Sequence, residues 1–100
     1  NMNTIVIELI KGLEIKIEFL ADNVINFHII KNEVVRGARA LKYFRLVFDA
    51  LFASGIKLIL VSLAKKPETR HIRLMALRAG FKKHMDLDNN IIYYLMKGRN

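Results

Sequence analysis

Cysteine and tryptophan are both absent from this chain of 100 residues, and proline occurs only once. Without cysteine there are no disulfide bonds, thiol nucleophiles or thiolate zinc sites. No apolar run reaches the ~20 residues of a membrane span, because Lys11, Glu14, Lys16 and Glu18 interrupt the most hydrophobic stretch. The first residues also lack the basic segment, apolar core and cleavage site of a signal peptide. We therefore expect a cytoplasmic protein that does not bind a membrane.

The composition is that of a folded domain with an unevenly distributed charge. Hydrophobic residues make up 53% of the sequence, enough for a substantial core, and we expect one domain over residues 1–100. The net charge is +8, yet residues 1–30 contain two basic and four acidic residues, whereas residues 31–100 contain fifteen basic and five acidic. This concentration of positive charge indicates an anionic cofactor, nucleic acid or an acidic protein as partner, the alternative being solubility alone.

The first third of the chain has the pattern of three consecutive strands. Residues 4–10 form an apolar run that ends at Lys11-Gly12, and residues 13–20 alternate between apolar and charged side chains. This period of two is typical of an antiparallel strand with one solvated face. Asp22-Asn23 suits a tight turn before a third strand over residues 24–30. The sequence therefore predicts a β-meander.

The period changes after Gly37, where apolar residues recur at helical spacing until Gly55 ends the pattern. The next segment, 56–64, is almost entirely apolar, as in a central strand covered on both faces. A second helix is expected over residues 67–79, and a final strand over 91–96. A strand, a helix and a strand in succession predict a right-handed crossover between parallel strands. The fold class is therefore α+β, with a mixed sheet in which the β-meander precedes a β-α-β-α-β arrangement.

The loop Arg36-Gly37-Ala38-Arg39-Ala40 is the strongest candidate for a binding site, because it leads directly into the first helix. Free N–H groups at a helix start, a glycine and two guanidinium groups together make a cradle for an anion. The helix dipole supplies only ~0.3–1 kcal/mol, so the arginines, the backbone donors and apolar contacts would provide most of the affinity. The alternative interpretation is a solvated helix start with ordinary surface arginines.

From about Leu13 to Lys97 the chain resembles the GNAT family of acyl-CoA N-acyltransferases. Besides the order of the elements, two signatures carry the resemblance: the Arg36–Ala40 loop, and Arg78-Ala79-Gly80-Phe81 leading from the second helix into a β-hairpin. The ending Gly-Phe-Lys-Lys followed by Ile-Ile-Tyr-Tyr-Leu-Met-Lys is also similar. The chain looks like the short, divergent, phage-like members of the family.

This resemblance implies acetyl-CoA or another acyl-CoA as a substrate, an unknown amine as the acceptor, and no metal. The pyrophosphate would lie on the backbone amides of residues 36–41, and the pantetheine arm along the third strand, where that strand splays from the strand at 56–63. The amine would attack the thioester directly. The residues that the resemblance assigns to coenzyme A are Phe27, Ile29, Arg36, Gly37, Ala38, Arg39, Ala40 and Leu41.

The sequence departs from the family pattern at four positions. Arg39 and Leu41 occupy places where the loop pattern has glycine, and glycine or alanine. Thr69 stands where the family often has asparagine, and Ala76 where it often has a tyrosine general acid. The segment before Gly12 is also too short for the helical region that shapes the amine site in the family, which implies truncation on the N-terminal side.

Three residues are candidates for catalysis. His28 is the candidate general base, since it lies on the third strand and imidazole groups exchange protons near neutral pH. Asn26 shares its face and would orient the acceptor. Tyr93 or Tyr94 would replace the missing general acid, only one of the two neighbours being able to face the cleft. The alternative for His28 is a structural histidine in the sheet.

Other functions remain open at this stage. His71 is expected at the surface between two arginines and His84 after two lysines, and the histidines are too scattered for a metal site. The second function is a catalytically inactive GNAT-like regulatory protein whose basic face contacts a protein or nucleic acid. A homodimer is also considered, because a second copy would complete the missing substrate wall.

Overall fold

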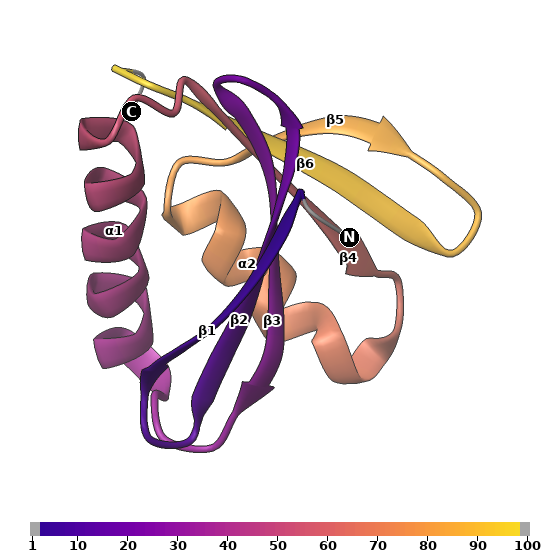
Figure 1. Ribbon diagram of the computed structural model, residues 1–100. Helices are drawn as coiled ribbons and strands as arrows, with labels where there is room; N and C mark the ends of the chain where they lie inside the picture. Colours follow the sequence, from indigo (N-terminus) through magenta and orange to yellow (C-terminus); the bar gives the residue numbers. More distant parts are fainter. Residues whose placement is uncertain (1–2, 99–100) are drawn as a thin grey trace.

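The computed structural model describes residues 3–98 as one six-stranded sheet with two helices (Figure 1). The elements, in chain order, are β1 (Thr4–Ile10), β2 (Leu13–Ala21), β3 (Val24–Asn32), α1 (Gly37–Ala53), β4 (Leu58–Ala64), the 3-10 turn η1 (Pro67–Thr69), α2 (Arg70–Arg78), β5 (Lys82–Asp86) and β6 (Asn90–Met96).

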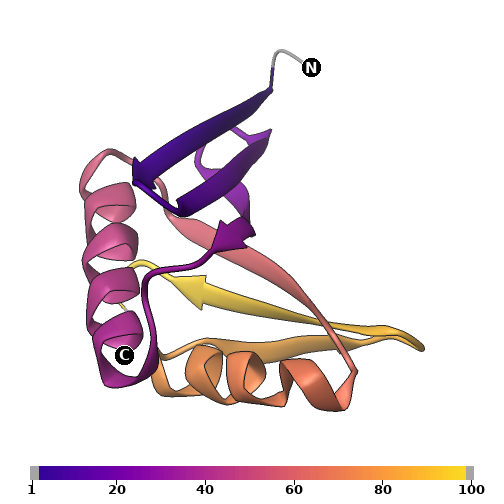
Figure 2. The ribbon, with the colours of Figure 1, turned by 90° about the horizontal axis from the view of Figure 1, so that it is seen from below.

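The order of the strands in the sheet is β1-β2-β3-β4-β6-β5. β1, β2 and β3 form the expected antiparallel meander, whereas β3 and β4 are parallel because α1 crosses over between them. β4, β6 and β5 are again antiparallel. Figure 2 shows β1 and β5 at opposite ends of the sheet. The structure thus confirms the mixed α+β sheet that the sequence predicts.

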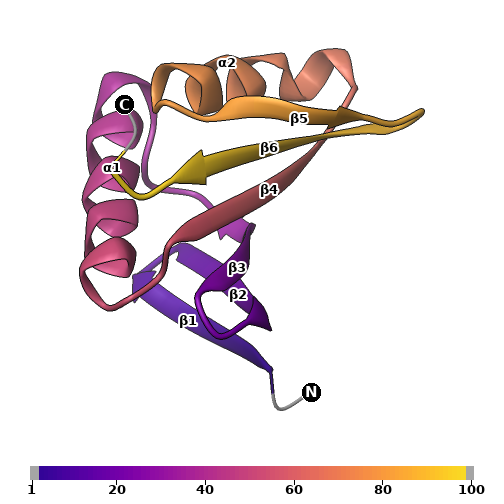
Figure 3. The same cartoon turned by 90° about the horizontal axis from the view of Figure 1, so that it is seen from above.

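Both helices pack on the same face of the sheet. The strands present odd-numbered side chains to this face, such as Ile15 of β2, Ile25 of β3 and Ile59 of β4, each at most 1% exposed. Phe48 of α1 and Phe81, just after α2, join the same buried cluster. Figure 3 shows α1 and α2 meeting at one corner of the molecule, with the sheet extending away from them to β1. Along these stretches the even-numbered side chains lie on the other face, and the register shifts in β1, β2 and β5 change the alternation locally.

Two boundaries differ from the sequence-based expectation. Ile56 is buried but precedes β4, and its N–H donates to Leu51 O at 3.2 Å to close the end of α1. The second helix begins as the 3-10 turn at Pro67, and α2 proper starts at Arg70. Within residues 3–98, neither helix has the length and hydropathy of a transmembrane span.

Candidate functional site

The parallel strands β3 and β4 separate along most of their length. Only three residue pairs join them, Val24 with Leu58, Ile25 with Ile59 and Asn26 with Leu60. Beyond these pairs β3 continues to Asn32 and β4 to Ala64 without pairing to each other. Because β3 bonds only to β2 there, its other edge offers unpaired N–H and C=O groups. The splay that the sequence implied is therefore present.

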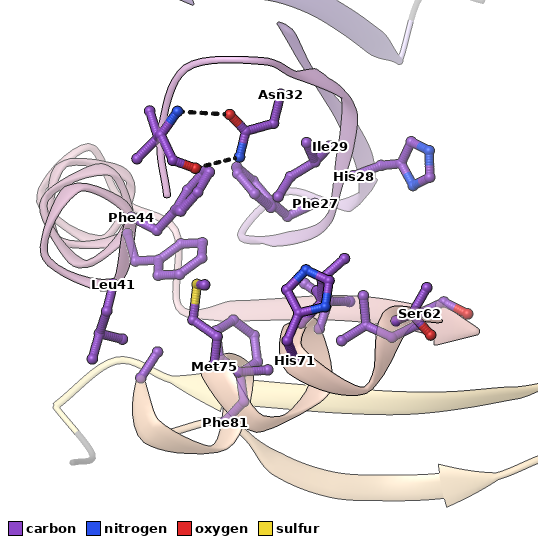
Figure 4. A pocket seen from close by; sticks show the side chains of 18 of the residues that line it. Phe27, His28, Ile29, Asn32, Leu41, Phe44, Ser62, His71, Met75 and Phe81 are labelled. Atoms are coloured by element: carbon purple, nitrogen blue, oxygen red, sulfur yellow. Dashed lines mark hydrogen bonds between the residues drawn. The ribbon is translucent and has the colours of Figure 1, made fainter. Parts of the chain in front are cut away.

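This split leads into a cavity of about 650 Å³ on the helical side of the sheet (Figure 4). One wall is β3 from Phe27 onward with the loop to Gly37, the second is the first half of α1, and the third is formed by the end of β4 and by α2. Most of the lining is apolar, with a few polar groups at the edges. Volume and composition are those of a small-molecule or cofactor site.

Asn32, the last residue of β3, holds the loop at the mouth of the cavity. Its Oδ1 accepts hydrogen bonds from the N–H groups of Val34 and Val35 at 3.3 and 3.0 Å, and its Nδ2 donates to Val35 O at 2.9 Å. The guanidinium of Arg36 donates to Asn32 O at 3.0 Å. These short-range bonds, an Asx turn in effect, fix the chain just before α1 begins.

The start of α1 has unpaired backbone donors. Arg36 is the N-cap residue, and no side chain caps the helix there. The N–H of Ala40 donates to Arg36 O at 3.3 Å, so the earlier N–H groups of Gly37, Ala38 and Arg39 have no intrahelical acceptor. The first turn contains no acidic residue that would compete with an anion. Gly37 has a φ of 62°, in the left-handed region that favours glycine, and an added Cβ would meet nothing within 4 Å.

The eight residues that the resemblance assigns to coenzyme A differ in their exposure and in whether they line the cavity. Gly37, Ala38 and Arg39 are exposed and combine free N–H groups with a positive side chain. Ala40 and Phe27 are 1% and 4% exposed, so their side chains belong to the core. The N–H of Ala40 is already used within the helix. Five of the eight residues line the cavity: Phe27, Ile29, Arg36, Gly37 and Leu41.

The candidate catalytic residues lie on different faces of the sheet. His28 is exposed and is among the residues that line the cavity at the split, although Figure 4 shows its ring directed outward, away from the other labelled side chains. Tyr93 is 4% exposed within the core, and Tyr94 points to the opposite face, where its ring makes an edge contact with His84 at 5.9 Å. Neither tyrosine lines the cavity between β3 and β4.

His71 is exposed, as the sequence analysis expected, and it is also a residue of the candidate site. It lies in the first turn of α2 and lines the cavity, and Figure 4 shows its ring between α2 and β3. Met75, one helical turn later, lines the same wall. This spacing was the signal in the sequence that would have placed His71 beside the apolar stripe of the helix.

Two side chains, Arg73 and Thr69, close the β4–α2 connection. Arg73 Nη1 donates to Ala64 O at 2.5 Å, to Lys66 O at 3.0 Å and to Thr69 Oγ1 at 2.7 Å. The hydroxyl of Thr69 lies 2.7 Å from Ala64 O. Arg73 therefore holds the turn at Pro67 in place. Because its guanidinium makes these bonds, it is not a free charge on the surface of α2.

Ser62 of β4 lies on the opposite edge of the split from His28. Asn90 Nδ2 donates to its Oγ at 2.9 Å, which fixes the position of the hydroxyl. Within the part of the chain that the structure describes, no three His, Asp or Glu side chains gather as a metal site would require.

Comparisons with known proteins identify the fold. No protein-family profile matches the sequence, and no curated protein matches it. Among solved structures, a protein assigned to the GNAT family of acetyltransferases, from Desulfovibrio desulfuricans, has a TM-score of 0.70 at 14% identity, over 85% of this chain and 60% of its own. A variant of spermidine N-acetyltransferase SpeG from Vibrio cholerae has a TM-score of 0.71 at 14% identity, over 93% of this chain and 64% of its own.

A third similar structure is the microcin C7 self-immunity acetyltransferase MccE, in complex with acetyl-CoA and AMP. Its TM-score is 0.63 at 12% identity, over 96% of this chain and 62% of its own. The chain thus has the fold of GNAT acetyltransferases, as its sequence predicted. It spans about three fifths of the length of these three proteins, from 60% to 64%.

Proposed function

We propose that this protein binds acetyl-CoA or another acyl-CoA between β3 and β4 and transfers the acyl group to an amine. The observation that carries the proposal is the split itself: β3 and β4 share three residue pairs and then diverge around a cavity of about 650 Å³. The fold supports the proposal, because one structure of similar fold contains acetyl-CoA and another belongs to a spermidine N-acetyltransferase.

The phosphate end of the ligand would lie at the start of α1. The N–H groups of Gly37, Ala38 and Arg39 are free, and the guanidinium groups of Arg36 and Arg39 add positive charge. The amides of the pantetheine arm would bond to the free edge of β3, with Phe27 and Ile29 supplying apolar contacts below it. This arrangement supports an extended, anionic ligand that is apolar over part of its length.

The reaction needs one nucleophilic attack and two proton movements. The amine nitrogen forms a bond with the thioester carbonyl carbon, the carbon–sulfur bond breaks, and coenzyme A leaves as a thiolate that takes up a proton from water, because neither candidate tyrosine lines the cavity. The amine loses a proton, for which His28 is the candidate base because it lines the cavity at the split and its ring is directed outward to solvent. Asn26, two residues earlier on the same face, would accept a hydrogen bond from the amine. The acceptor would thus approach from the face that carries no helix.

Calorimetric titration with acetyl-CoA, with ATP as a control for non-specific polyanion binding, tests the proposal. We expect micromolar binding of acetyl-CoA, equivalent to about 8 kcal/mol, and little response to ATP. The double variant Arg36→Ala/Arg39→Ala should lose at least tenfold in affinity, roughly 1.4 kcal/mol. The matched control Lys82→Ala/Lys83→Ala removes the same charge from β5, away from the cavity, and should bind normally.

Equal, weak responses to both ligands would contradict a coenzyme A site. If acetyl-CoA does bind, release of free thiol in the presence of amines, spermidine among them, tests the transfer step. Binding without thiol release from any amine would leave a coenzyme A binding protein and refute the enzymatic part of the proposal.

A further inference from the structure

Gly12, in the turn between β1 and β2, differs from the other glycines of the chain. All five glycines have a positive φ, which residues with a Cβ rarely adopt, and that of Gly12 is 91°. At the other four, an added Cβ would meet nothing closer than 3.4 Å. At Gly12 it would lie 2.9 Å from Cγ1 of Val34, closer than real Cβ atoms come to a neighbouring atom. This turn therefore requires glycine because of its surroundings as well as its backbone.

The segment that surrounds Gly12 is the loop between β3 and α1. The N–H of Glu33, the first residue of that loop, donates to Gly12 O at 2.9 Å. Next to this bond, Leu13 of β2 pairs with Asn32 of β3, and the Leu13 side chain is fully buried. Gly12 itself is buried, although Lys11 in the same turn is exposed. The turn and the loop are thus packed against each other through the main chain.

The end of β3 is irregular just before this contact. The pairing of β2 with β3 shifts register between Glu14 and Ile15, which leaves one extra residue, Ile30, on β3. A bulge of this kind bends the strand that carries it and increases its twist. The regular sheet alone therefore does not set the position of the loop at residues 33–36, and contacts from outside β3 are needed to fix it.

Asn32 extends the contact to the start of α1. Its Oδ1 accepts a hydrogen bond from the N–H of Val34 at 3.3 Å, and its main-chain O accepts one from the guanidinium of Arg36 at 3.0 Å. The free N–H groups of α1 begin at the next residue, Gly37. Val34 is thus held by Asn32 within the loop and meets Gly12 from the turn.

We propose that Gly12 is a positioning residue for the loop that would hold the phosphates of an acyl-CoA. Because it has no side chain, the β1–β2 turn packs against Val34 and fixes the position of the free N–H groups at the start of α1. The ligand is that of the proposed function, on which this inference rests, whereas the position of the loop can be measured without a ligand. Gly12 would act only through the loop, since it is not among the residues that line the cavity.

The size of the displacement decides whether binding is affected. An ordinary contact needs at least 3.4 Å, so Val34 would have to move by about 0.5 Å to accommodate a Cβ at position 12. Rotation of the valine is restricted, because a side chain branched at Cβ has few χ1 rotamers. Hydrogen bonds from N–H groups to a phosphate have a narrow range of lengths, and a binding site tolerates errors of only about 0.5 Å. A shift of this size in the loop is therefore enough to weaken phosphate binding.

Gly12→Ala tests the proposal when acetyl-CoA is titrated by calorimetry at a temperature where the chain is folded. We expect the affinity to fall at least fivefold. Gly55→Ala is the matched control, because Gly55 has a φ of 111° and an added Cβ there would meet nothing within 4 Å. This control carries comparable backbone strain and should bind normally. Unchanged affinity in Gly12→Ala, or an equal loss in both variants, would overturn the proposal.

A second change separates the contact from the strain in the turn. Val34→Ala removes both methyl groups that an added Cβ at Gly12 would meet, at 2.9 and 3.8 Å. The double variant Gly12→Ala/Val34→Ala should therefore bind acetyl-CoA within about twofold of Val34→Ala alone. The backbone strain at position 12 is the same with and without Val34, so recovery can only come from the relieved contact. A double variant that binds as weakly as Gly12→Ala would refute a role of this contact.

The position of the loop is measured in the chain without a ligand. The NMR amide resonances of Val35, Arg36 and Gly37 should shift in Gly12→Ala and remain in place in Gly55→Ala. In the double variant they should return to their positions in Val34→Ala. Unshifted resonances in Gly12→Ala would refute the inference even if acetyl-CoA binds. Failure of the unaltered chain to bind acetyl-CoA would refute the proposed function, and with it the role of Gly12 in holding that ligand, while shifted resonances would still show that Gly12 positions the loop.

Discussion

The ring of Phe27 on β3 stands almost perpendicular to that of Phe48 on α1, with centroids 5.1 Å apart at 75°. The same Phe48 ring meets Phe81 edge-on at 5.2 Å, and Phe27 meets Phe44 in the same manner at 6.2 Å. Phe48 thus joins the third strand, the first helix and the end of the second helix. These contacts form the floor of the cavity, so the core and the candidate site share a wall.

We expect Phe48→Ala to lower the free energy of unfolding by about 3–5 kcal/mol, because it opens a cavity where three other rings lose contact. Phe48→Leu keeps most of the volume and should cost less. Tyr43→Ala is a matched control, since Tyr43 is partly exposed at the edge of the core and, among the described residues, its ring pairs with no aromatic ring other than that of Phe44. Urea denaturation measures the three values, and a Phe48→Ala loss no larger than that of Tyr43→Ala would contradict the central role of this ring.

Asn32→Ala should weaken acetyl-CoA binding as well as stability. The change removes the acceptor for two N–H groups and the donor to Val35 O, at about 1 kcal/mol for each bond, and frees the loop before α1. Asn32→Asp keeps both acceptor bonds and places a carboxylate against Val35 O, so we expect an intermediate loss. Calorimetry and thermal unfolding measure both effects; unchanged affinity in Asn32→Ala would show that the loop does not shape the site.

His71→Ala should reduce the affinity for acetyl-CoA about fivefold, a loss on the order of 1 kcal/mol, because the side chain forms part of the cavity wall. His84→Ala is the control. His84 is also exposed, but it lies against Tyr94 on the other face of the sheet. Equal affinities of the two variants would argue that the ligand does not reach the α2 wall.

The hairpin of β5 and β6 is tied to the loop before η1 by an ion pair that should respond to acid. Lys65 Nζ donates to Asp86 Oδ1 at 2.6 Å, and this hydrogen bond lowers the pKa of Asp86 below its usual value of 3.8, with a smaller contribution from Lys83. A carboxyl group whose pKa is lower in the folded state stabilises the fold above pH 3.8, and the contribution disappears as the pH falls through the folded-state value.

Asp86→Asn should therefore lower the melting temperature slightly at neutral pH and leave it unchanged in strong acid. The effect is small because the pair is exposed to solvent. Asp88→Asn, which removes a nearby exposed acid that forms no ion pair within residues 3–98, provides the control and should leave the melting temperature nearly unchanged at neutral pH. A constant difference between Asp86→Asn and the unaltered chain at every pH would show that the ion pair is not its cause.

Most of the fold was predictable because its patterns are local. The alternation over residues 13–20 and the helical spacing after Gly37 each require only that neighbours share a face, and both elements formed where expected. β5 has no such pattern, since all five of its residues are exposed, and only the resemblance to known proteins indicated a hairpin there. The start of β4 was placed two residues early because Ile56 is buried without being part of the strand.

The site was harder to predict because its walls come from distant segments. The Arg36–Ala40 loop could be found from its composition. The helix geometry is needed to show that the free N–H groups in this loop are those of Gly37, Ala38 and Arg39. The role of His71 depends on the rotation of α2 against the sheet, which tertiary packing decides. No sequence pattern shows that the carbonyls of Ala64 and Lys66 lie within reach of the Arg73 guanidinium.

The free edge of β3 consists of main-chain groups, and every residue type except proline supplies both an N–H and a C=O group. A chain of this fold is therefore able to replace nearly every side chain along the split without losing the groups that would bond to an extended ligand. The similar structures show how far such replacement extends, with TM-scores of 0.63 to 0.71 at 12% to 14% identity. Chains of this fold thus share the path of the backbone along the split while few of their residues are identical.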